Sequence, residues 1–187
     1  MAGVHVKFRT VMLDPPWNER GGGKIKRGAD KHYKLMSTPD IIKTIYQCEH
    51  WNQVDQIAHM YLWVTNNFLQ DGLQVMSALG FRYVTNFVWV KNRIGLGQYF
   101  RGQHELCLFG TRGVGAAKLR TTRKNLPSVL VAPRGAHSCK PGESYTLIEN
   151  RSQGPYLEIF GRTYRHNWTV WGNELDWPPL SERFNMC

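Results

Sequence analysis

The sequence has no run of 18 apolar residues, so no segment is long enough to cross a membrane as a helix. Its first residues, MAGVHVK, lack the long apolar stretch of a signal peptide. The four cysteines stand far apart and form no Cys-x-x-Cys pair, so neither a zinc site nor a disulfide framework is indicated. We therefore expect no membrane span, no metal and a reducing cytoplasm.

Acidic residues are scarce relative to basic ones. Aspartate and glutamate total 14, lysine and arginine total 24, and the net charge is +10. This imbalance favours a polyanionic partner, of which nucleic acid is the commonest, although a basic surface can also serve solubility alone. The sequence also has no internal repeat and no low-complexity linker, and residues 1–187 are expected to form one domain.

Apolar patterning predicts strands that alternate with helices. Strands are expected over residues 8–13, 58–65, 81–91, 104–110, 128–132, 156–160 and 168–171, and helices over 38–46, 67–79 and 140–150. This alternation predicts an α/β fold, a mostly parallel sheet with helices on both faces. Ligands of such sheets bind outside the carboxyl ends of the strands, where Asp14, Lys91 and Arg162 are expected to lie.

The tetrapeptide Asp14-Pro15-Pro16-Trp17 follows the first expected strand. Prolines cannot donate to a sheet ladder, so the strand must stop there in a stiff corner. The carbonyls of Asp14 and Pro15 and the Asp14 carboxylate are then expected to be free acceptors beside the flat Trp17 ring. Such a corner suits a planar ligand with an amino group, such as adenine or cytosine, while the simpler alternative is a strand end followed by a turn.

Three basic segments, residues 18–31, 92–102 and 111–124, are expected to bracket this corner and to bind phosphates. Their candidate phosphate-binding residues are Lys24, Lys26, Arg27, Arg101, Arg120 and Arg123.

Several motifs occur in a fixed order along the chain. They are Asp14-Pro15-Pro16-Trp17, Leu62-Trp63-Val64-Thr65, Trp89-Val90-Lys91, Lys140-Pro141, Glu158-Ile159-Phe160-Gly161-Arg162, Asn167-Trp168 and Gly172-Asn173-Glu174-Leu175. The set resembles the adenine N6-methyltransferase family that is named for the seventy-kilodalton subunit of the mRNA methyltransferase. The resemblance covers roughly residues 8 to 176.

The resemblance implies a Rossmann-like methyltransferase fold with S-adenosylmethionine as methyl donor, and a permuted order in which the catalytic strand precedes the cofactor strand. Asp14 and the Pro15 carbonyl would accept both N–H bonds of the adenine amino group, so that its lone pair points at the sulfonium methyl. Positioning and electrostatic preorganisation would supply the catalysis, and the base must leave its helix if the substrate is a duplex.

The resemblance also assigns residues to roles. The catalytic corner is Asp14, Pro15, Pro16 and Trp17, and the cofactor-binding residues are Asp14, Pro15, Lys140, Phe160, Arg162, Asn173 and Glu174. Besides the basic residues above, substrate contacts are expected from Trp17, Tyr33, Glu105 and Lys140. A solvent-exposed lysine and a solvated strand-edge glutamate are the alternatives for Lys140 and Glu105. Glu158 needs a partner in its buried strand, and Arg162 is expected to provide it.

Two features depart from the family pattern. Thr163-Tyr164-Arg165 stands where many members have His-Asn, so no histidine contact is expected, and Asn173-Glu174 replaces Asn-Gln. The leading hypothesis is an adenine methyltransferase, with DNA favoured over RNA and a bacterial or phage source over a eukaryotic one. This implies the cytoplasm, or the nucleus of a eukaryotic cell.

Three alternatives remain open. They are an RNA adenosine methyltransferase, a non-catalytic nucleic-acid-binding subunit with the same fold, and a methyltransferase acting on cytosine N4. Because family members often work as dimers, a homo- or heterodimer is also expected.

Overall fold

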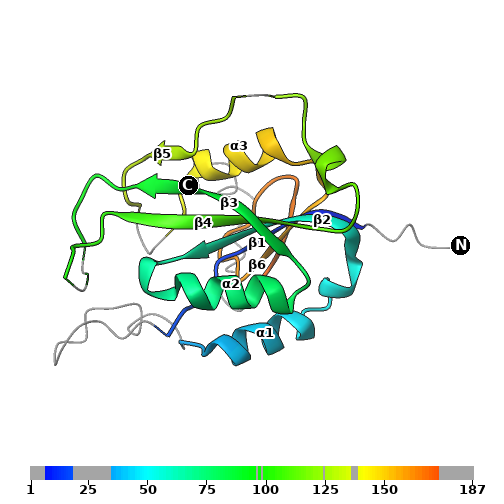
Figure 1. Ribbon diagram of the computed structural model, residues 1–187, viewed down its shortest axis with the longest axis horizontal. Coiled ribbons are helices and arrows are strands. Elements are labelled where there is room, and N and C mark those ends of the chain that lie inside the picture. Colours follow the sequence, from blue (N-terminus) through cyan, green and yellow to red (C-terminus); the bar gives the residue numbers. More distant parts are fainter. Residues whose placement is uncertain are drawn as a thin grey trace, which may run out of the picture.

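The computed structural model describes residues 7–18, 35–95, 97, 99–123, 125–135 and 139–172. Its centre is a seven-stranded sheet between two layers of helices (Figure 1). Helices α1 (Thr38–Gln47) and α2 (Leu69–Ala78) cover one face, and α3 (Gly142–Arg151) covers the other. The expected α/β architecture with helices on both faces is confirmed.

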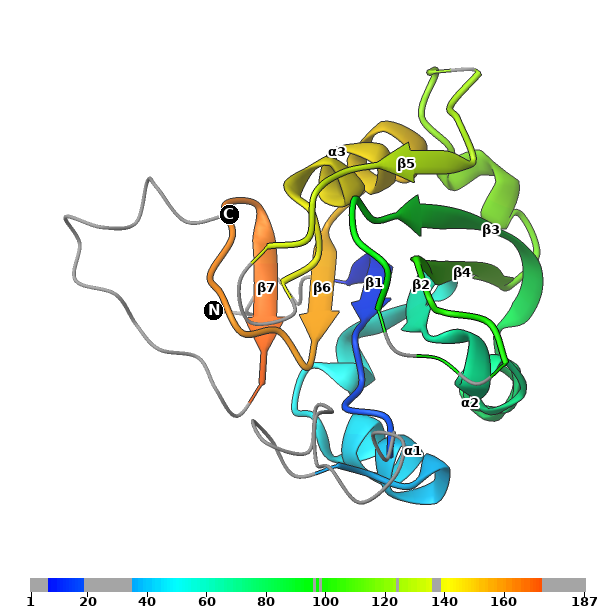
Figure 2. The ribbon, with the colours of Figure 1, turned by 90° about the vertical axis from the view of Figure 1, so that its left-hand side faces the viewer.

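The sheet is mostly parallel, as predicted. Its strands are β1 (Phe8–Leu13), β2 (Val54–Val64), β3 (Arg82–Val90), β4 (His104–Arg112), β5 (Val129–Val131), β6 (Tyr156–Ile159) and β7 (Trp168–Trp171). They lie in the order β5-β3-β4-β2-β1-β6-β7. Figure 2 shows β1, β6 and β7 side by side, with their arrowheads at one edge of the sheet.

One strand runs against the others. β4 pairs antiparallel with both β2 and β3, whereas the remaining pairs are parallel. β4 therefore begins at the edge where β2 and β3 end, and it ends at the opposite edge. We call these the carboxyl edge and the amino edge, after the ends of the parallel strands.

Successive core side chains along a strand pack on opposite faces of the sheet, because the side chains of a strand alternate with a period of two. Val11 and Leu13 of β1 pack in the layer under α1 and α2, while Met12 between them packs in the α3 layer. The central strand β2 is buried continuously from Ala58 to Val64 because both of its faces are covered.

Local signals place the helix ends. Ser37 is the N-cap of α1 and accepts from the Asp40 backbone N–H, so the helix begins at Thr38, one residue earlier than it would if Thr38 itself were the cap. Gly80 follows α2 with a φ of 78°. Its N–H donates to the Ser77 carbonyl and that of Phe81 donates to the Met76 carbonyl, which is the Schellman ending of a helix.

Three 3-10 turns were not predicted from the sequence. They are η2 (Trp51–Gln53), η3 (Asn66–Phe68) and η4 (Ala116–Leu119). In the described part of the chain, no helix is both long and apolar enough to span a bilayer.

Candidate active site at the carboxyl edge

Charged residues meet where the strands end. Asp14 follows β1, Lys91 follows β3, and Glu105 lies at the start of antiparallel β4. Lys140 reaches the same edge from the segment before α3. These four residues come from separate parts of the chain, and parallel pairing with one reversed strand brings them together.

The four side chains form an alternating row of charges. Lys140 Nζ lies 2.7 Å from Asp14 Oδ1 and 3.3 Å from Glu105 Oε2, and Lys91 Nζ lies 2.5 Å from Glu105 Oε1. Each side chain is between 10% and 17% exposed. Two carboxylates and two ammonium groups leave the row electrically neutral, so it can be buried without an unpaired charge.

The charges of Glu105 and Lys140 stabilise one another. Burial opposes the charge of Glu105, but the ammonium groups of Lys140 and Lys91 outweigh it and lower the pKa of Glu105 to about 2. Burial likewise opposes the charge of Lys140, yet the carboxylates of Asp14 and Glu105 raise its pKa above the ordinary value. Glu105 and Lys140 are therefore both ionised across the physiological pH range, and neither alternative of a solvated side chain holds.

The Asp-Pro-Pro-Trp corner differs in part from its prediction. The Pro15 carbonyl was expected to be free, but it accepts the Trp17 backbone N–H at 2.9 Å, because a tight turn ends the strand. Its second lone pair is what remains for a ligand. The Pro16 carbonyl accepts the Met36 N–H at 2.9 Å, which pins the returning chain beside the corner.

The role expected of the Trp17 ring is wrong in this conformation. Trp17 is 6% exposed, and its ring stacks on Phe68 with 5.5 Å between centroids. Its indole N–H donates to the Trp63 carbonyl at 2.9 Å. The ring therefore braces the corner from inside the core instead of presenting a face to a base.

Two cavities flank Asp14. One, of about 570 Å³, extends from Asp14 and Pro16 along α1 to Gly172. The other, of about 350 Å³, extends from Asp14 and Lys140 to the segment after β6. Both are also lined by Phe160 and Arg162, so these two residues and Asp14 form the boundary between the cavities.

The segments that follow β6 and β7 lie very close to each other. Phe160 has a φ of 68°, a left-handed conformation that is uncommon outside glycine and clusters at functional sites. At Gly161 an added Cβ would lie 2.2 Å from Val170 Cγ1, and at Gly172 it would lie 2.1 Å from the Gly161 carbonyl oxygen. Glycine at both positions lets the chain ends after β6 and β7 pack together beside the larger cavity.

A second buried carboxylate lies behind Asp14. Glu158 is 5% exposed, and the Tyr145 hydroxyl donates to its two oxygens at 3.1 and 3.2 Å. Burial, together with the nearby Asp14 charge, raises the pKa of Glu158 to about 8 against the hydrogen bond from Tyr145. Tyr145 is thus a hydrogen-bond partner of Glu158, and the pairing of Glu158 with Arg162 stays a prediction.

The basic segments do not all surround Asp14. Arg101 lies in the loop between β3 and β4, at the carboxyl edge, where its Nε donates to the Gly95 carbonyl. Arg120 and Arg123 follow β4 and therefore lie toward the amino edge, where Arg120 pairs with Ser152. Their expected place beside the corner is wrong, because β4 runs antiparallel and carries the chain about 27 Å away over its length.

Several predicted site residues lie outside the described part of the chain. They are Lys24, Lys26, Arg27, Tyr33, Asn173 and Glu174. The described Asn18 and Leu35 show only that the chain leaves and re-enters beside the corner.

Lys91 was expected at this edge but without a role in the site, and Tyr145 was not expected there at all. Lys91 was available as a lysine directly after a buried strand, but its partner Glu105 depends on the antiparallel strand. Tyr145 carried no local signal, because one tyrosine on a helix does not reveal that it faces Glu158.

Two buried donors at this edge have no partner in the described part of the chain. They are Trp63 Nε1 and Thr65 Oγ1, both at the end of β2. Among the described residues, no group of three histidine, cysteine or acidic side chains could hold a metal ion.

This fold and edge define a Rossmann-like methyltransferase domain in which the catalytic strand precedes the cofactor strand. The family model described as MT-A70 matches residues 8–174, and the chain belongs to that family. MT-A70 methyltransferases use S-adenosylmethionine as methyl donor.

Curated relatives agree with this assignment. The chain is 30% identical over 181 residues to the N(6)-adenosine-methyltransferase MT-A70-like protein of Drosophila melanogaster, covering 91% of this chain and 27% of the relative. It is 29% identical over 182 residues to the N(6)-adenosine-methyltransferase catalytic subunit METTL3 of Homo sapiens, covering 91% and 28%. It is 26% identical over 191 residues to the N6-methyladenosine RNA methyltransferase MTA1 of Pyricularia oryzae, covering 90% and 47%. The chain therefore spans less than half of the length of each of these relatives.

Proposed function

We propose that this chain transfers a methyl group from S-adenosylmethionine to the N6 amino group of an adenine in nucleic acid. The observation that carries the proposal is the Asp14 carboxylate, held by Lys140 at 2.7 Å on the boundary between two cavities. One cavity can take the methyl donor and the other the acceptor base, and Asp14 faces both.

The corner addresses the main difficulty of the reaction. The lone pair of the adenine amino group is delocalised into the ring, so the nitrogen is a poor nucleophile. Asp14 accepts one N–H, and the second lone pair of the Pro15 carbonyl accepts the other. Both acceptors are fixed before the base arrives, Asp14 by Lys140 and Pro15 by the turn to Trp17, which is the preorganisation that lowers a barrier.

The cavity residues fit the parts of the cofactor. The larger cavity has the volume of a small-molecule site and combines the Phe160 backbone turn and Gly161 with the charged groups of Asp14 and Arg162. Asp14 would hold the methionine amino group, and Arg162 the ribose side. When bound, S-adenosylmethionine supplies an electrophilic methyl group on a sulfonium.

The acceptor strand is proposed to be RNA. The relatives above carry names that specify adenosine, and one name specifies RNA. The preference for DNA, which rested on the shortness of the chain, gains no support from them and stays a prediction. Arg101 is a described cation at the carboxyl edge that can meet a phosphate of either strand.

Labelled S-adenosylmethionine tests the proposal, with single-stranded RNA, single-stranded DNA and duplex DNA of one adenine-containing sequence as acceptors. Nucleoside mass spectrometry of the digested products is expected to show N6-methyladenosine from RNA. N6-methyldeoxyadenosine alone would establish the DNA alternative, and N4-methylcytosine would establish the cytosine alternative. No product with any acceptor contradicts the activity of the isolated chain.

The Asp14→Ala variant tests the role of the Asp14 carboxylate. Its turnover is expected to fall by about a hundredfold or more, with the fold retained, because Lys140 keeps Glu105 as a partner. Calorimetric titration with S-adenosylmethionine separates the non-catalytic alternative. A folded wild-type chain that releases no heat would be a partner subunit and not an enzyme.

A further inference from the structure

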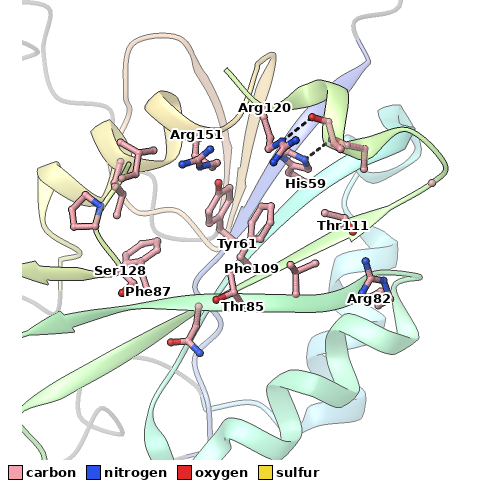
Figure 3. Close-up of a pocket in the computed structure, with 18 of the residues that line it drawn as sticks. His59, Tyr61, Arg82, Thr85, Phe87, Phe109, Thr111, Arg120, Ser128 and Arg151 are labelled. Atoms are coloured by element: carbon pink, nitrogen blue, oxygen red, sulfur yellow. Dashed lines mark hydrogen bonds between the residues drawn. The ribbon is translucent and has the colours of Figure 1, made fainter. Parts of the chain in front are cut away.

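A third cavity in the described part of the chain lies away from Asp14. It has a volume of about 610 Å³ and lies on the α3 face of the sheet, toward the amino edge (Figure 3). None of the residues that line it lines either cavity beside Asp14. The proposed methyl transfer therefore leaves it without a role.

The floor of the cavity follows from the strand register. His59 of β2 pairs with Thr111 of β4, and Thr111 pairs with Arg82 of β3, so these side chains form one row on the α3 face. A second row contains Tyr61 and Phe109. The register of β3 against β4 shifts between Tyr83 and Thr85, beside these rows, and Leu147 and Arg151 of α3 line the cavity on the opposite side.

The far wall is held in place by a buried hydrogen-bond chain. His59 Nε2 lies 2.8 Å from the Ala116 carbonyl of η4, and His59 Nδ1 lies 2.7 Å from Ser152 Oγ, which also bonds the Tyr61 hydroxyl at 2.7 Å. Both ring nitrogens are thus engaged. This chain ties η4 and the end of α3 to the sheet, so the cavity is a built feature of the fold.

The lining is cationic and lacks any acid. Arg82, Arg120 and Arg151 line the cavity, and no aspartate or glutamate does. In Figure 3, Arg120 and Arg151 lie above the rings of Tyr61 and Phe109, and Arg82 lies at the start of β3. Burial lowers the pKa of His59 on the floor of the cavity, and the positive charges of Arg120 and Arg151 lower it further.

The remaining lining supplies a flat apolar surface and small polar groups. Phe87, Phe109 and Pro127 are apolar, while Thr85 and Ser128 carry hydroxyls. Guanidinium groups bind phosphate with two parallel hydrogen bonds, and aromatic surfaces accept nucleobases. A volume of about 610 Å³ is within the range of small-molecule sites.

We propose that this cavity binds a nucleoside phosphate, with the phosphate between Arg120 and Arg151 and the base against the aromatic floor. The nucleoside phosphate is either a free nucleotide or one nucleotide of a bound strand. The site is separate from the methyl-transfer site and does not depend on its assignment.

Uridine 5′-monophosphate is the probe, because uracil has no amino group for the Asp14 corner to bind. Calorimetric titration is expected to show binding to the wild type and at least tenfold weaker binding to R120Q/R151Q, since two charge-assisted contacts are lost. The R123Q variant removes one cation nearby, outside the lining, and is expected to bind as the wild type does. Asp14→Ala is also expected to retain binding, which keeps this test distinct from that of methyl transfer.

Three further arms complete the experiment. Uridine without phosphate is expected to bind at least tenfold more weakly than the monophosphate. Another arm uses an eight-nucleotide uridine RNA. If the RNA binds more tightly than the monophosphate and this difference disappears in R120Q/R151Q, the natural ligand is a nucleotide of a bound strand. If the monophosphate binds more tightly than the RNA, the natural ligand is a free nucleotide. R82Q, at an exposed position, serves if the double variant does not fold. Equal binding of the monophosphate and of the RNA to wild type and cavity variants, or no binding of either to wild type, overturns the proposal.

Discussion

At the residue scale, the site depends on a shared ammonium group. Lys140 lies between Asp14 and Glu105, and Lys91 holds the far side of Glu105. Asp14 is therefore paired in a largely buried position and has a fixed direction before any ligand binds. Preorganised charge of this kind does not have to be rearranged during the reaction.

Replacing Lys140 with methionine tests this arrangement. Methionine keeps most of the side-chain volume but leaves Asp14 without its ion pair, so methyl transfer is expected to fall by about a hundredfold or more. Turnover with labelled S-adenosylmethionine is the measurement. Lys118→Met, the same change at an exposed lysine, is the control, and equal rates in both variants would contradict the role of Lys140.

Glu158 predicts a pH dependence of stability. Its folded pKa is about 8 and its ordinary value is 4.5, so between these values the folded state holds a proton that the unfolded state has lost. Stability contributed by this group therefore falls as pH rises through that window. Glu158→Gln cannot ionise, so the variant is expected to gain stability relative to wild type between pH 5 and pH 8.

Urea unfolding of both proteins at pH 5, 6, 7 and 8 measures this gain. Glu143→Gln, at an exposed position in the first turn of α3, is expected to lack it. Parallel stability curves for wild type and Glu158→Gln would show that Glu158 is ionised in the folded protein at neutral pH.

At the element scale, α2 packs unusually close to the sheet. A Cβ on Gly72 would lie 2.6 Å from Val64 Cγ1 and 3.1 Å from Leu108 Cδ1. Val64 is the last residue of β2, which ends at the carboxyl edge. The contact with α2 therefore fixes the position of β2 at that edge. A glycine within a helix is otherwise unfavourable, and here it allows the close contact.

Gly72→Ala is therefore expected to destabilise the protein. Alanine improves helix propensity by about 1 kcal/mol, but the overlap with core side chains costs about 1–3 kcal/mol and should prevail. Urea unfolding measures the change. Gln74→Ala, on the exposed face of the same helix, is expected to be neutral or slightly stabilising, and a stabilised Gly72→Ala would show that α2 can shift away from the sheet.

The direction of β4 has the largest effect on how basic segments are placed. The loop before β4 carries Arg101 to the carboxyl edge, whereas the segment after it carries Arg120 and Arg123 toward the amino edge. One reversed strand thus divides the cations between two sites.

At the scale of the whole molecule, a net charge of +10 predicts salt-sensitive binding of nucleic acid. The two edges should contribute differently. Arg101→Gln is expected to reduce the slope of log affinity against log salt by about 0.7 for single-stranded RNA, while Arg123→Gln leaves it unchanged. Fluorescence anisotropy between 50 and 200 mM salt measures the slopes, and equal reductions would place the strand across both edges.

The sequence by itself determined much of this protein. Apolar patterning located every strand and α-helix of the described residues, because a buried strand or helix face must be apolar at its own period. The Asp-Pro-Pro-Trp corner was found as a local motif, because a strand stop depends on neighbouring residues. Lys140 and Phe160-Gly161-Arg162 were assigned to the site by their resemblance to the family motifs.

Only the tertiary structure decided what those residues contact. The Trp17 ring is in the core because Phe68 and Trp63 lie against it, and neither is close in sequence. Glu105 meets Lys140 because β4 runs antiparallel, and the same reversal places Arg120 over a separate cavity. Such contacts join segments far apart in the chain, and their geometry depends on strand order and direction, which residue patterns within a segment do not encode.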